Sequence, residues 1–415
     1  MQEGRAVTLP ERTDRDFDER VATFDLHAPE LQENPYPFYA EMRGRCPVAH
    51  VDSHGGHYVL TRMADIRQVC ADARTFANDQ VLIPDWEFPL GRQIPGQTNG
   101  EEHRLYRLAL ADLFTPAAVN RLEPRIRATA RRLAEEIRDR RGGEFMSDFA
   151  SPLSSETFLH LFDVDREDLP DLLRFKNLLV HGGAEGRIRL KEDEGRLVDF
   201  FAALVERRRT QEEPGADAVS HLLRAPYGDR RLTDEEIINI SIVLMLASLD
   251  TTSAVTGNVF AWLAEHPDRR DELIADPGLI PRAVEELLRF EGVTGTVRVV
   301  TRPTEVNGVP MPAGARVMML MGAAGRDPEA FDAPDTVDFG RKDVRHATFG
   351  LGAHRCLGMH LARRTVKVAI EEFHRVMPHW EPRPGTRPER VLGHVRGVAE
   401  MRVVPGDRTR TAKGQ

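Results

Sequence analysis

Residues 349–358 read Phe349-Gly350-Leu351-Gly352-Ala353-His354-Arg355-Cys356-Leu357-Gly358 and lead into an amphipathic helical pattern. Glycines let a loop turn tightly and bring backbone N–H groups close to the Cys356 sulfur. The predicted helix after Cys356 directs the positive end of its dipole at the same atom. Both effects lower the pKa of a thiol, and a thiolate is a much better ligand than a thiol. A lone cysteine is more often a buried structural residue, but this setting favours a ligating thiolate.

The composition excludes several classes of protein. The 415 residues include 57 Lys+Arg and 66 Asp+Glu, and the net charge of −9 argues against a general nucleic-acid binder. The longest apolar runs, residues 242–247 and 259–264, are far shorter than the roughly 20 residues of a membrane-spanning helix. The N-terminal sequence alternates charges and lacks the apolar stretch of a secretory signal. We expect a cytoplasmic protein with no membrane segment, and we expect it to be a monomer.

The cysteines and the turn residues limit the organisation further. Only Cys46, Cys70 and Cys356 occur, without a CxxC pair, so a disulfide framework, a four-cysteine zinc site and an iron–sulfur cluster are excluded. The Pro- and Gly-containing stretches are short and lie between periodic segments, which indicates loops rather than linkers. We expect one domain over residues 1–415, with residues 1–20 and 405–415 flexible.

Helical periodicity dominates the chain, and strand-like runs are few and short. Apolar residues recur at three-to-four spacing in residues 63–76, 103–113, 116–140, 195–208, 234–264, 281–290 and 357–376. Runs rich in Val, Met and Tyr predict strands at residues 57–61, 296–301, 316–320 and 400–404. The predicted fold class is therefore mainly α with small β-sheets.

The longest predicted helix begins at a capping box formed by Thr233 and Glu236, and its pattern continues to Glu265. About 30 residues rising 1.5 Å each span on the order of 45 Å, enough to cross a domain. Its apolar middle changes abruptly into a polar run at residues 248–253. Polar groups inside a core need partners or a purpose.

The F-G-x-G-x-H-x-C-x-G pattern of residues 349–358 resembles the haem-binding loop of the cytochrome P450 family. The resemblance runs from Asn34 to the strand near Met401 and is similar to the bacterial soluble, camphor-hydroxylating branch. It implies a triangular prism with haem b buried between the long helix and the Cys356 loop. It also implies that Cys356 is the axial iron ligand and that one atom of O2 enters an apolar substrate. The loop residues assigned to haem binding are Phe349, Gly350, His354 and Gly358.

Residues 247–251 of the long helix resemble the family's oxygen-activation signature. On this resemblance Ala247 lies against the haem, Asp250 brings protons and Thr251 holds dioxygen. Ser248 departs from the usual glycine, and its hydroxyl is expected to bond to the backbone carbonyl four residues earlier. The alternative is a Thr251 bonded to its own helix and an Asp250 in a surface ion pair.

A second resemblance concerns structure rather than chemistry. Glu286 and Arg289 are three apart, share one face of the predicted helix at 281–290, and are similar to the family's structural ion pair. Residues 323–329 resemble the family's Asn-Arg-Asp-Pro segment, with Gly325 in the place of asparagine.

Four basic residues are assigned to the haem propionates by the same resemblance. His103 and Arg107 are four apart on one helix face, so both can reach one anionic group. Arg298 follows the helix of Glu286, and His354 lies in the Cys356 loop. Each of them alone would be read as a solvated cation, and their order along the chain favours the propionate role.

The chain needs an external electron source if the resemblance holds. We find no G-x-G-x-x-G dinucleotide fingerprint after a strand, so a separate ferredoxin and ferredoxin reductase are implied. A basic patch would suit an acidic ferredoxin. Unrelated solvated arginines are an equally good reading of the residues concerned, which are Arg104, Arg107, Arg355, Arg363 and Arg364.

The residues around the substrate are predicted by family position. Residues 79–99 mix apolar and turn residues, which suits an apolar lid or equally a packed surface loop. The predicted wall is mostly aliphatic and favours a compact apolar substrate such as a terpenoid over a larger polyketide or peptide metabolite. Its members are Val81, Trp86, Phe88, Leu244, Ala247, Val293, Val297 and Val395.

Two other functions stay open. A peroxide-driven peroxygenase would use the same thiolate-ligated haem without a ferredoxin, but it does not need the Asp250 and Thr251 proton relay. A non-catalytic haem protein on the same fold would be a gas sensor or a recruitment partner, and Ser248 and Gly325 leave room for it.

Overall fold

The computed structural model describes residues 14–84, 88, 90–168, 170, 172–174, 183–213, 215–293 and 295–406, with side chains for all of these except 14 and 183–194. Helices form most of the regular structure in this part of the chain, as predicted. The α-helices are α1 (Asp14–Ala22), α2 (Tyr36–Arg45), α3 (Met63–Ala71), α4 (Gly100–Ala111), α5 (Pro116–Asp139), α6 (Ser151–Phe162), α8 (Gly183–Arg209), α9 (Ala218–Arg224), α10 (Asp234–Leu249), α11 (Thr251–Glu265), α12 (Pro267–Ala275), α13 (Ile280–Phe290), α14 (Met321–Gly325) and α15 (Met359–Val376).

The largest sheet has the strand order β1-β2-β10-β7-β3. Strand β10 is parallel to β2 and antiparallel to β7, so Val317 stands between Tyr58 and Arg298. The strands of this sheet are β1 (Val48–Val51), β2 (His57–Leu60), β3 (Phe76–Ala77), β7 (Gly295–Val300) and β10 (Arg316–Leu320). The smaller sheets contain β4 (Gly143–Glu144), β5 (Pro226–Tyr227), β6 (Arg230–Arg231), β8 (Thr304–Val306), β9 (Val309–Met311), β11 (Trp380–Pro382), β12 (Glu389–Val391), β13 (Gly397–Glu400) and β14 (Arg402–Pro405).

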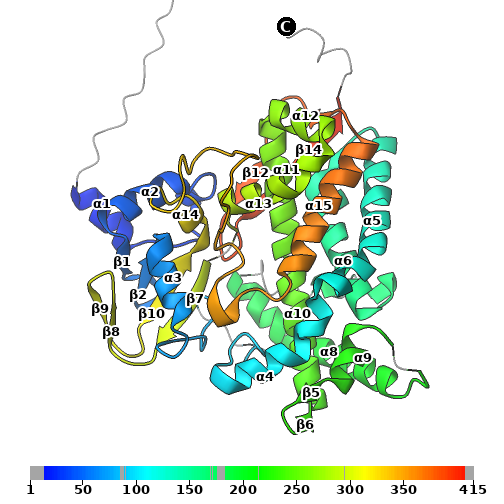
Figure 1. The fold of residues 1–415 in the computed structure, drawn as a ribbon, viewed down its shortest axis with the longest axis horizontal. Helices are drawn as coiled ribbons and strands as arrows, with labels where there is room; N and C mark the ends of the chain where they lie inside the picture. The colour runs from blue at the N-terminus through cyan, green and yellow to red at the C-terminus, as the bar shows by residue number, and fades with distance from the viewer. Residues whose placement is uncertain are drawn as a thin grey trace, which may run out of the picture.

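The sheet and the helices occupy different parts of the molecule. Figure 1 shows the five-stranded sheet together with α1, α2 and α3 on the left of the molecule, and α5 and α6 on the right. Helices α10 and α11 lie between these two parts. The helical side has its own buried apolar core, and two smaller cores lie around the sheet and the N-terminal helices. The helix pair α10 and α11 is therefore placed where the two sides meet.

The long helix begins as predicted but is broken in the middle. The Thr233 hydroxyl accepts from the Glu236 N–H at 3.2 Å, and the Thr233 N–H donates to the Glu236 carboxylate at 2.7 Å, which completes the capping box. Helix α10 ends at Leu249 and α11 begins at Thr251, so the predicted single helix over 234–264 is wrong at Asp250. The Ser248 and Thr251 hydroxyls donate to backbone carbonyls here and compete with the helical pattern.

The same helix pair has the composition of a membrane span. Among the described residues, Asp234–Glu265 is long and apolar enough to cross a membrane, and 61% of its most apolar window is buried inside the protein. The central helix of a protein core passes the same test of length and hydropathy.

One predicted helix boundary near the sheet needs correction. The pattern at 63–76 predicts one helix, but α3 ends at Ala71 and Phe76 belongs to β3. The Asp72 carboxylate accepts the Thr75 N–H at 3.1 Å, and this side-chain turn ends the helix.

Parts of the two ends that are expected to be flexible belong to regular elements, and their flexibility stays a prediction. Helix α1 covers residues 14–22 and buries Phe17 and Val21, because its apolar face packs on the core that contains Phe38. Pro405 belongs to β14, and the Gly406 N–H donates to the His379 carbonyl at 2.9 Å. Residues 1–13 and 407–415 lie outside the described residues.

Candidate functional site

The Cys356 loop is shaped by glycines in a way that other residues cannot match. Gly350 and Gly352 have φ angles of +68° and +69°, a region that favours glycine. A Cβ atom on Gly352 would lie 2.1 Å from the backbone oxygen of Cys70 at the end of α3. The Cys356 N–H donates to the Phe349 carbonyl at 2.7 Å and closes the loop. The loop is therefore held against α3 by a close contact between two backbones.

The Cys356 thiol lies in a mixed electrostatic setting. Burial raises the pKa of the Cys356 thiol, whereas the Gly358 N–H and the charges of Arg107, Arg363 and Arg355 act to lower it. The loop N–H therefore acts on the Cys356 pKa in the expected direction, and burial acts against it. The residue keeps accessible surface, so it can reach a metal, and coordination deprotonates a thiol outright.

The four residues predicted to bind propionates come together in the structure. The rings of His103 and His354 stack with centroids 3.9 Å apart, and the charges of Arg107 and Arg298 act on both rings. Burial, followed by these charges, lowers the pKa of His103 to about 4 and that of His354 to about 3. These residues come from α4, β7 and the Cys356 loop, so three distant segments build one site.

The cluster carries positive charge that no described carboxylate balances. Arg298 is buried, and among the described residues it donates to its neighbours, the Val297 carbonyl at 2.7 Å and the Thr296 hydroxyl at 3.3 Å. Arg107 donates to the Arg355 carbonyl at 2.7 Å. Burial lowers the pKa of both guanidinium groups. Buried charges are normally paired, so the donor set fits an anionic group such as the two propionates of a haem.

The polar run in the central helices forms a second part of the site. The Thr251 hydroxyl donates to the Ala247 carbonyl at 2.6 Å, and the Ser248 hydroxyl donates to the Met245 carbonyl at 3.2 Å. The bond expected from Ser248 to the carbonyl four residues earlier is wrong, because the hydroxyl reaches the carbonyl three residues earlier. Ala247 is exposed although the helix is central, so the described residues do not cover its side chain. The Thr251 hydroxyl therefore makes the bond to its own helix that was the alternative to a catalytic role. The same hydroxyl can rotate and bond to another group.

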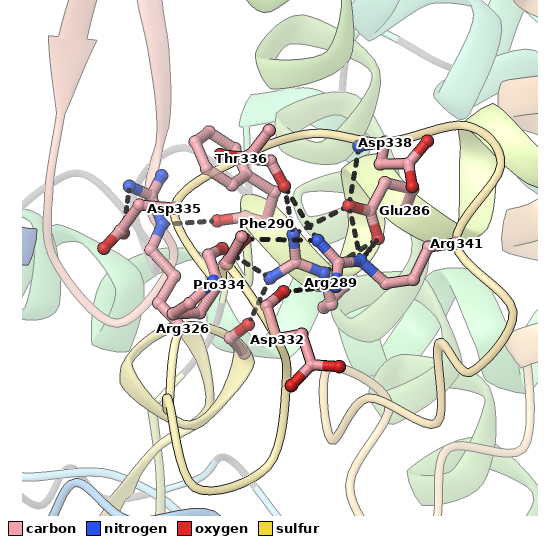
Figure 2. Close-up of polar contacts among 12 residues, drawn as sticks. Glu286, Arg289, Phe290, Arg326, Asp332, Pro334, Asp335, Thr336, Asp338 and Arg341 are labelled. Carbon is pink, nitrogen blue, oxygen red and sulfur yellow. Dashed lines mark hydrogen bonds and ion pairs between the residues drawn. The ribbon is translucent and has the colours of Figure 1, made fainter.

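The predicted ion pair of Glu286 and Arg289 is buried and extended by a third residue. Both side chains are at most 1% exposed and make two contacts of 2.8 Å. Arg341 donates to both Glu286 oxygens, at 2.9 and 3.1 Å. Arg289 also donates to the carbonyls of Gly325 and Pro334, at 2.6 and 2.7 Å. Figure 2 shows how these contacts tie α13 to the chain between α14 and the Cys356 loop.

Gly325 is explained by the same cluster. A Cβ atom there would lie 2.1 Å from the Arg289 carbonyl oxygen, so α14 approaches α13 backbone to backbone. The next residue, Arg326, lies between the rings of Tyr36 and Phe290, with its guanidinium carbon 3.4 and 3.5 Å from the two centroids. The glycine that departs from the family pattern is therefore a packing requirement.

Sequence reasoning missed Arg341 and the role of Glu285. Glu285 pairs with Arg363 in two contacts of 2.5 and 2.9 Å, and Arg363 lies 4.5 Å from the Phe349 ring centroid. The His346 Nε2 lies 3.4 Å from the Glu285 Oε2, an oxygen that also accepts from Arg363. This chain of contacts runs from α13 to the Cys356 loop. Single charged residues give no signal in a sequence, because their partners are far away along the chain.

The predicted basic patch is largely neutralised. Arg104 pairs with Glu101 within α4, and Arg363 pairs with Glu285. Arg364 pairs with Glu123 of α5. Three of the five arginines are therefore partners of the chain's own carboxylates, and the role of the five in docking stays a prediction. Arg107 and the exposed Arg355 stay outside such pairs among the described residues.

The predicted substrate residues separate into two groups. Phe88, Leu244, Val293 and Val395 pack on the helical core, while Val297 belongs to the core around the N-terminal helices. Val81 is half-buried, and Trp86 lies outside the described residues.

Comparisons with known proteins agree with this geometry. The family model described as Cytochrome P450 matches residues 154–277 and 278–392. The chain is 33% identical over 350 residues to the probable cytochrome P450 127A1 of Sinorhizobium fredii, covering 83% of each chain. It is 34% identical over 341 residues to the erythromycin C-12 hydroxylase of Saccharopolyspora erythraea, covering 80% of this chain and 84% of that one.

Solved structures lead to the same family. The crystal structure of CYP101J2 matches with a TM-score of 0.84 and 29% identity, and the match covers 93% of this chain and 97% of that one. Together with the loop around Cys356 and the buried cationic cluster, these matches leave no doubt about the family or its cofactor. The chain therefore belongs to the cytochrome P450 family, and it is a monooxygenase whose cofactor is haem b.

Proposed function

We propose that the protein hydroxylates or epoxidises a compact apolar molecule, with a terpenoid preferred over a polyketide, using O2 and electrons from a ferredoxin and its reductase. The observation that carries the proposal is the buried cluster of His103, His354, Arg107 and Arg298 beside the Cys356 loop. The apolar character of the residues at the predicted pocket positions supports the substrate class. Cytoplasmic location and a monomeric state belong to the same proposal.

Each part of the site has a distinct task in this proposal. Haem, when bound, supplies the activation of dioxygen at its iron. Cys356 ligates the iron, and the charged Arg107 and Arg298 bind the propionates together with the neutral rings of His103 and His354. Asp250 and the hydroxyl of Thr251 carry protons into the apolar space next to Ala247. The Thr251 hydroxyl has to exchange its 2.6 Å bond to the Ala247 carbonyl for a bond to a proton acceptor.

The electron source is proposed from the sequence. The chain has no dinucleotide-binding fingerprint and no cysteine cluster, so another protein has to deliver the electrons. Arg355 is exposed in the loop that carries the ligand and supports a docking site for an acidic partner.

The peroxygenase and the non-catalytic reading have their own tests. Sustained turnover with peroxide alone would favour the peroxygenase. A non-catalytic protein predicts that Thr251→Ala changes nothing measurable. The presence of Asp250 and Thr251 at the break between α10 and α11 favours the monooxygenase.

The test begins with the carbon monoxide difference spectrum of the reduced protein. A thiolate-ligated haem has a Soret band strongly shifted to the red of a histidine-ligated one. We expect this band in the wild type and its loss in Cys356→Ala and Cys356→His. A wild type that binds haem without the shifted band would refute Cys356 as the ligand.

A further inference from the structure

A cavity of about 520 Å³ lies near the end of α15, far along this helix from the Cys356 loop. His374, which lines it, comes fifteen residues after Met359, where α15 begins, and this separation is about 22 Å along the helix. The cavity is therefore outside the site built around Cys356. Its lining residues are Arg127, Leu273, Ile274, Pro277, Ile280, Glu371, His374 and Arg375.

Half of the lining residues are apolar. Leu273 and Ile274 belong to α12, Pro277 belongs to the turn that follows, and Ile280 is the first residue of α13. Small-molecule pockets of this volume typically combine apolar lining with a few polar groups that fix the orientation of the ligand. The apolar residues of this cavity therefore suit a hydrocarbon chain.

One polar residue of the lining has unused hydrogen-bonding capacity. His374 is 6% exposed, and neither of its ring nitrogens has a partner among the described residues. Burial lowers the pKa of His374 to about 3, so the ring is neutral and offers one donor and one acceptor. A buried polar group without a partner costs free energy. A ligand that brings a polar group to the His374 ring removes this cost.

Positive charge exceeds negative charge beside the cavity. Glu371 is paired with Arg127 at 2.8 Å, so its charge is balanced. Arg375 is 56% exposed and shares the buried Glu372 with two other arginines. This excess favours an anionic ligand. Among the described residues, five basic side chains share three carboxylates here, and they are Arg127, Arg131, Arg364, Lys367 and Arg375 with Glu123, Glu371 and Glu372.

A further cation with unused donors lies on the same face of α12. Arg270 precedes Leu273 and Ile274 by three and four residues, so the three share one face of this helix. The Arg270 Nε and Nη1 have no hydrogen-bond partner among the described residues, because the Asp271 carboxylate lies 3.8 Å from Nε. The charge of Arg270 acts on His374. A negative charge next to His374 therefore also interacts favourably with Arg270.

We propose that this cavity binds a carboxylate that carries an apolar chain. The chain lies on the apolar residues of α12, the following turn and α13, and the carboxylate contacts Arg375 and accepts from the His374 ring. The inference goes beyond the proposed function, because it involves neither the haem site nor the substrate of that site.

The test measures octanoate binding to the haem-loaded full-length protein after its iron is saturated with 4-phenylimidazole. The azole occupies the haem site, and its Soret band reports any displacement. Equilibrium dialysis with radiolabelled octanoate counts the bound ligand without a signal from the haem. We expect one octanoate to bind per protein while the azole band stays unchanged. 1-Octanol has the same chain without the charge and should bind about tenfold more weakly.

Two substitutions separate the charge from the apolar lining. Arg375→Gln should weaken octanoate binding about tenfold and leave octanol binding unchanged, because it removes only the charge. Ile274→Trp places a larger side chain in the apolar part and should weaken the binding of both compounds. The matched control is Arg345→Gln, because Arg345 is also an exposed arginine that pairs with one carboxylate, that of Asp343. It should leave both affinities unchanged.

Several outcomes would overturn the inference. They are the absence of octanoate binding, octanoate that binds only by displacing the azole, octanol that binds as tightly as octanoate, and Arg375→Gln changing both affinities by the same factor. If Ile274→Trp does not fold, the exposed Arg375→Gln still decides. The wild-type carbon monoxide spectrum tests the proposed function separately, so a failure of this inference is distinguishable from a failure of that function.

Discussion

Two glycines of this protein are required because backbones meet, and not only because a turn needs them. A Cβ atom added at position 352 would lie 2.1 Å from the Cys70 backbone oxygen, and one added at position 325 would lie 2.1 Å from the Arg289 backbone oxygen. A backbone atom cannot move aside as the end of a flexible side chain can. One of these contacts positions the Cys356 loop and the other positions the cluster around Arg289.

We predict that Gly352→Ala displaces the Cys356 loop. The variant combines a left-handed conformation, which costs about 1–2 kcal/mol for a residue with a Cβ atom, with the contact to Cys70. The control is Gly314→Ala, because Gly314 has a φ of +82° and open space around it. Carbon monoxide difference spectra should show a reduced red-shifted Soret band in Gly352→Ala and a normal band in Gly314→Ala. Equal spectra for the two variants would contradict the role of the close contact.

We predict that Thr251→Ala diverts electrons to hydrogen peroxide. Removing the hydroxyl removes a proton donor next to the apolar space, so reduced oxygen is released before it is used. The control is Thr256→Ala, because Thr256 also donates to the carbonyl four residues earlier, at 2.8 Å. Peroxide formed per electron pair should rise several-fold only in Thr251→Ala. It is measured with a surrogate ferredoxin and reductase and the apolar compound that gives the largest spin-state shift.

Helix α13 is joined to the rest of the molecule by the contacts of one buried carboxylate, that of Glu286. Glu286 accepts from Arg289, Arg341 and the Asp338 N–H, so three donors from two segments depend on it. Helix α4 offers the same E-x-x-R spacing in Glu101 and Arg104, but there both side chains are more than half exposed. The two helices share a sequence pattern and differ in burial.

We predict that Glu286→Gln costs about 3–5 kcal/mol of unfolding free energy, because it leaves the buried Arg289 guanidinium, and the partly buried Arg341 guanidinium beside it, without their counter-charge. The matched variant Glu101→Gln should have no measurable effect, since exposed pairs contribute little. Urea denaturation and haem content check both. If both variants lost a similar amount of unfolding free energy, burial would not determine how much an ion pair contributes to stability.

The molecule as a whole buries several histidines in their neutral form. Burial lowers the pKa of His57 and His160 to about 4 and that of His374 to about 3. His374 is 6% exposed, has no hydrogen-bond partner for either ring nitrogen among the described residues, and lies near the charge of Arg270. Unfolding returns these pKa values to about 6.5. The unfolded chain therefore binds protons that the folded chain does not bind.

We predict that stability is lost as the pH falls below about 6.5, and that His374 contributes down to a pH of about 3. In that pH range, one such histidine adds about 1.4 kcal/mol per pH unit to the slope of the unfolding free energy against pH. We expect His374→Phe to lack this contribution to the slope when the unfolding free energy is measured by urea denaturation at pH 5, 6 and 7. His50→Phe is the control, because the His50 side chain is 53% exposed. Parallel slopes for wild type and His374→Phe would contradict this account.

Local patterns were sufficient for the parts of the protein that depend on neighbours in the sequence. The helix periodicity, the capping box of Thr233 and Glu236, and the glycine pattern around Cys356 all act over a few residues, so a sequence displays them directly. The break at Asp250 was less predictable, because it depends on whether hydroxyl groups bond to the helix or elsewhere.

Only the tertiary structure shows the contacts between segments that are far apart in the chain. Arg341 joins Glu286 across 55 residues, Asn239 joins Ile94 across 145, and three arginines of the predicted basic patch have carboxylate partners. Burial, which acts against the loop N–H group on the Cys356 pKa, is a property of packing. The chain order thus specifies the elements and the ligand loop, whereas distances, charge pairing and desolvation arise only when distant segments meet.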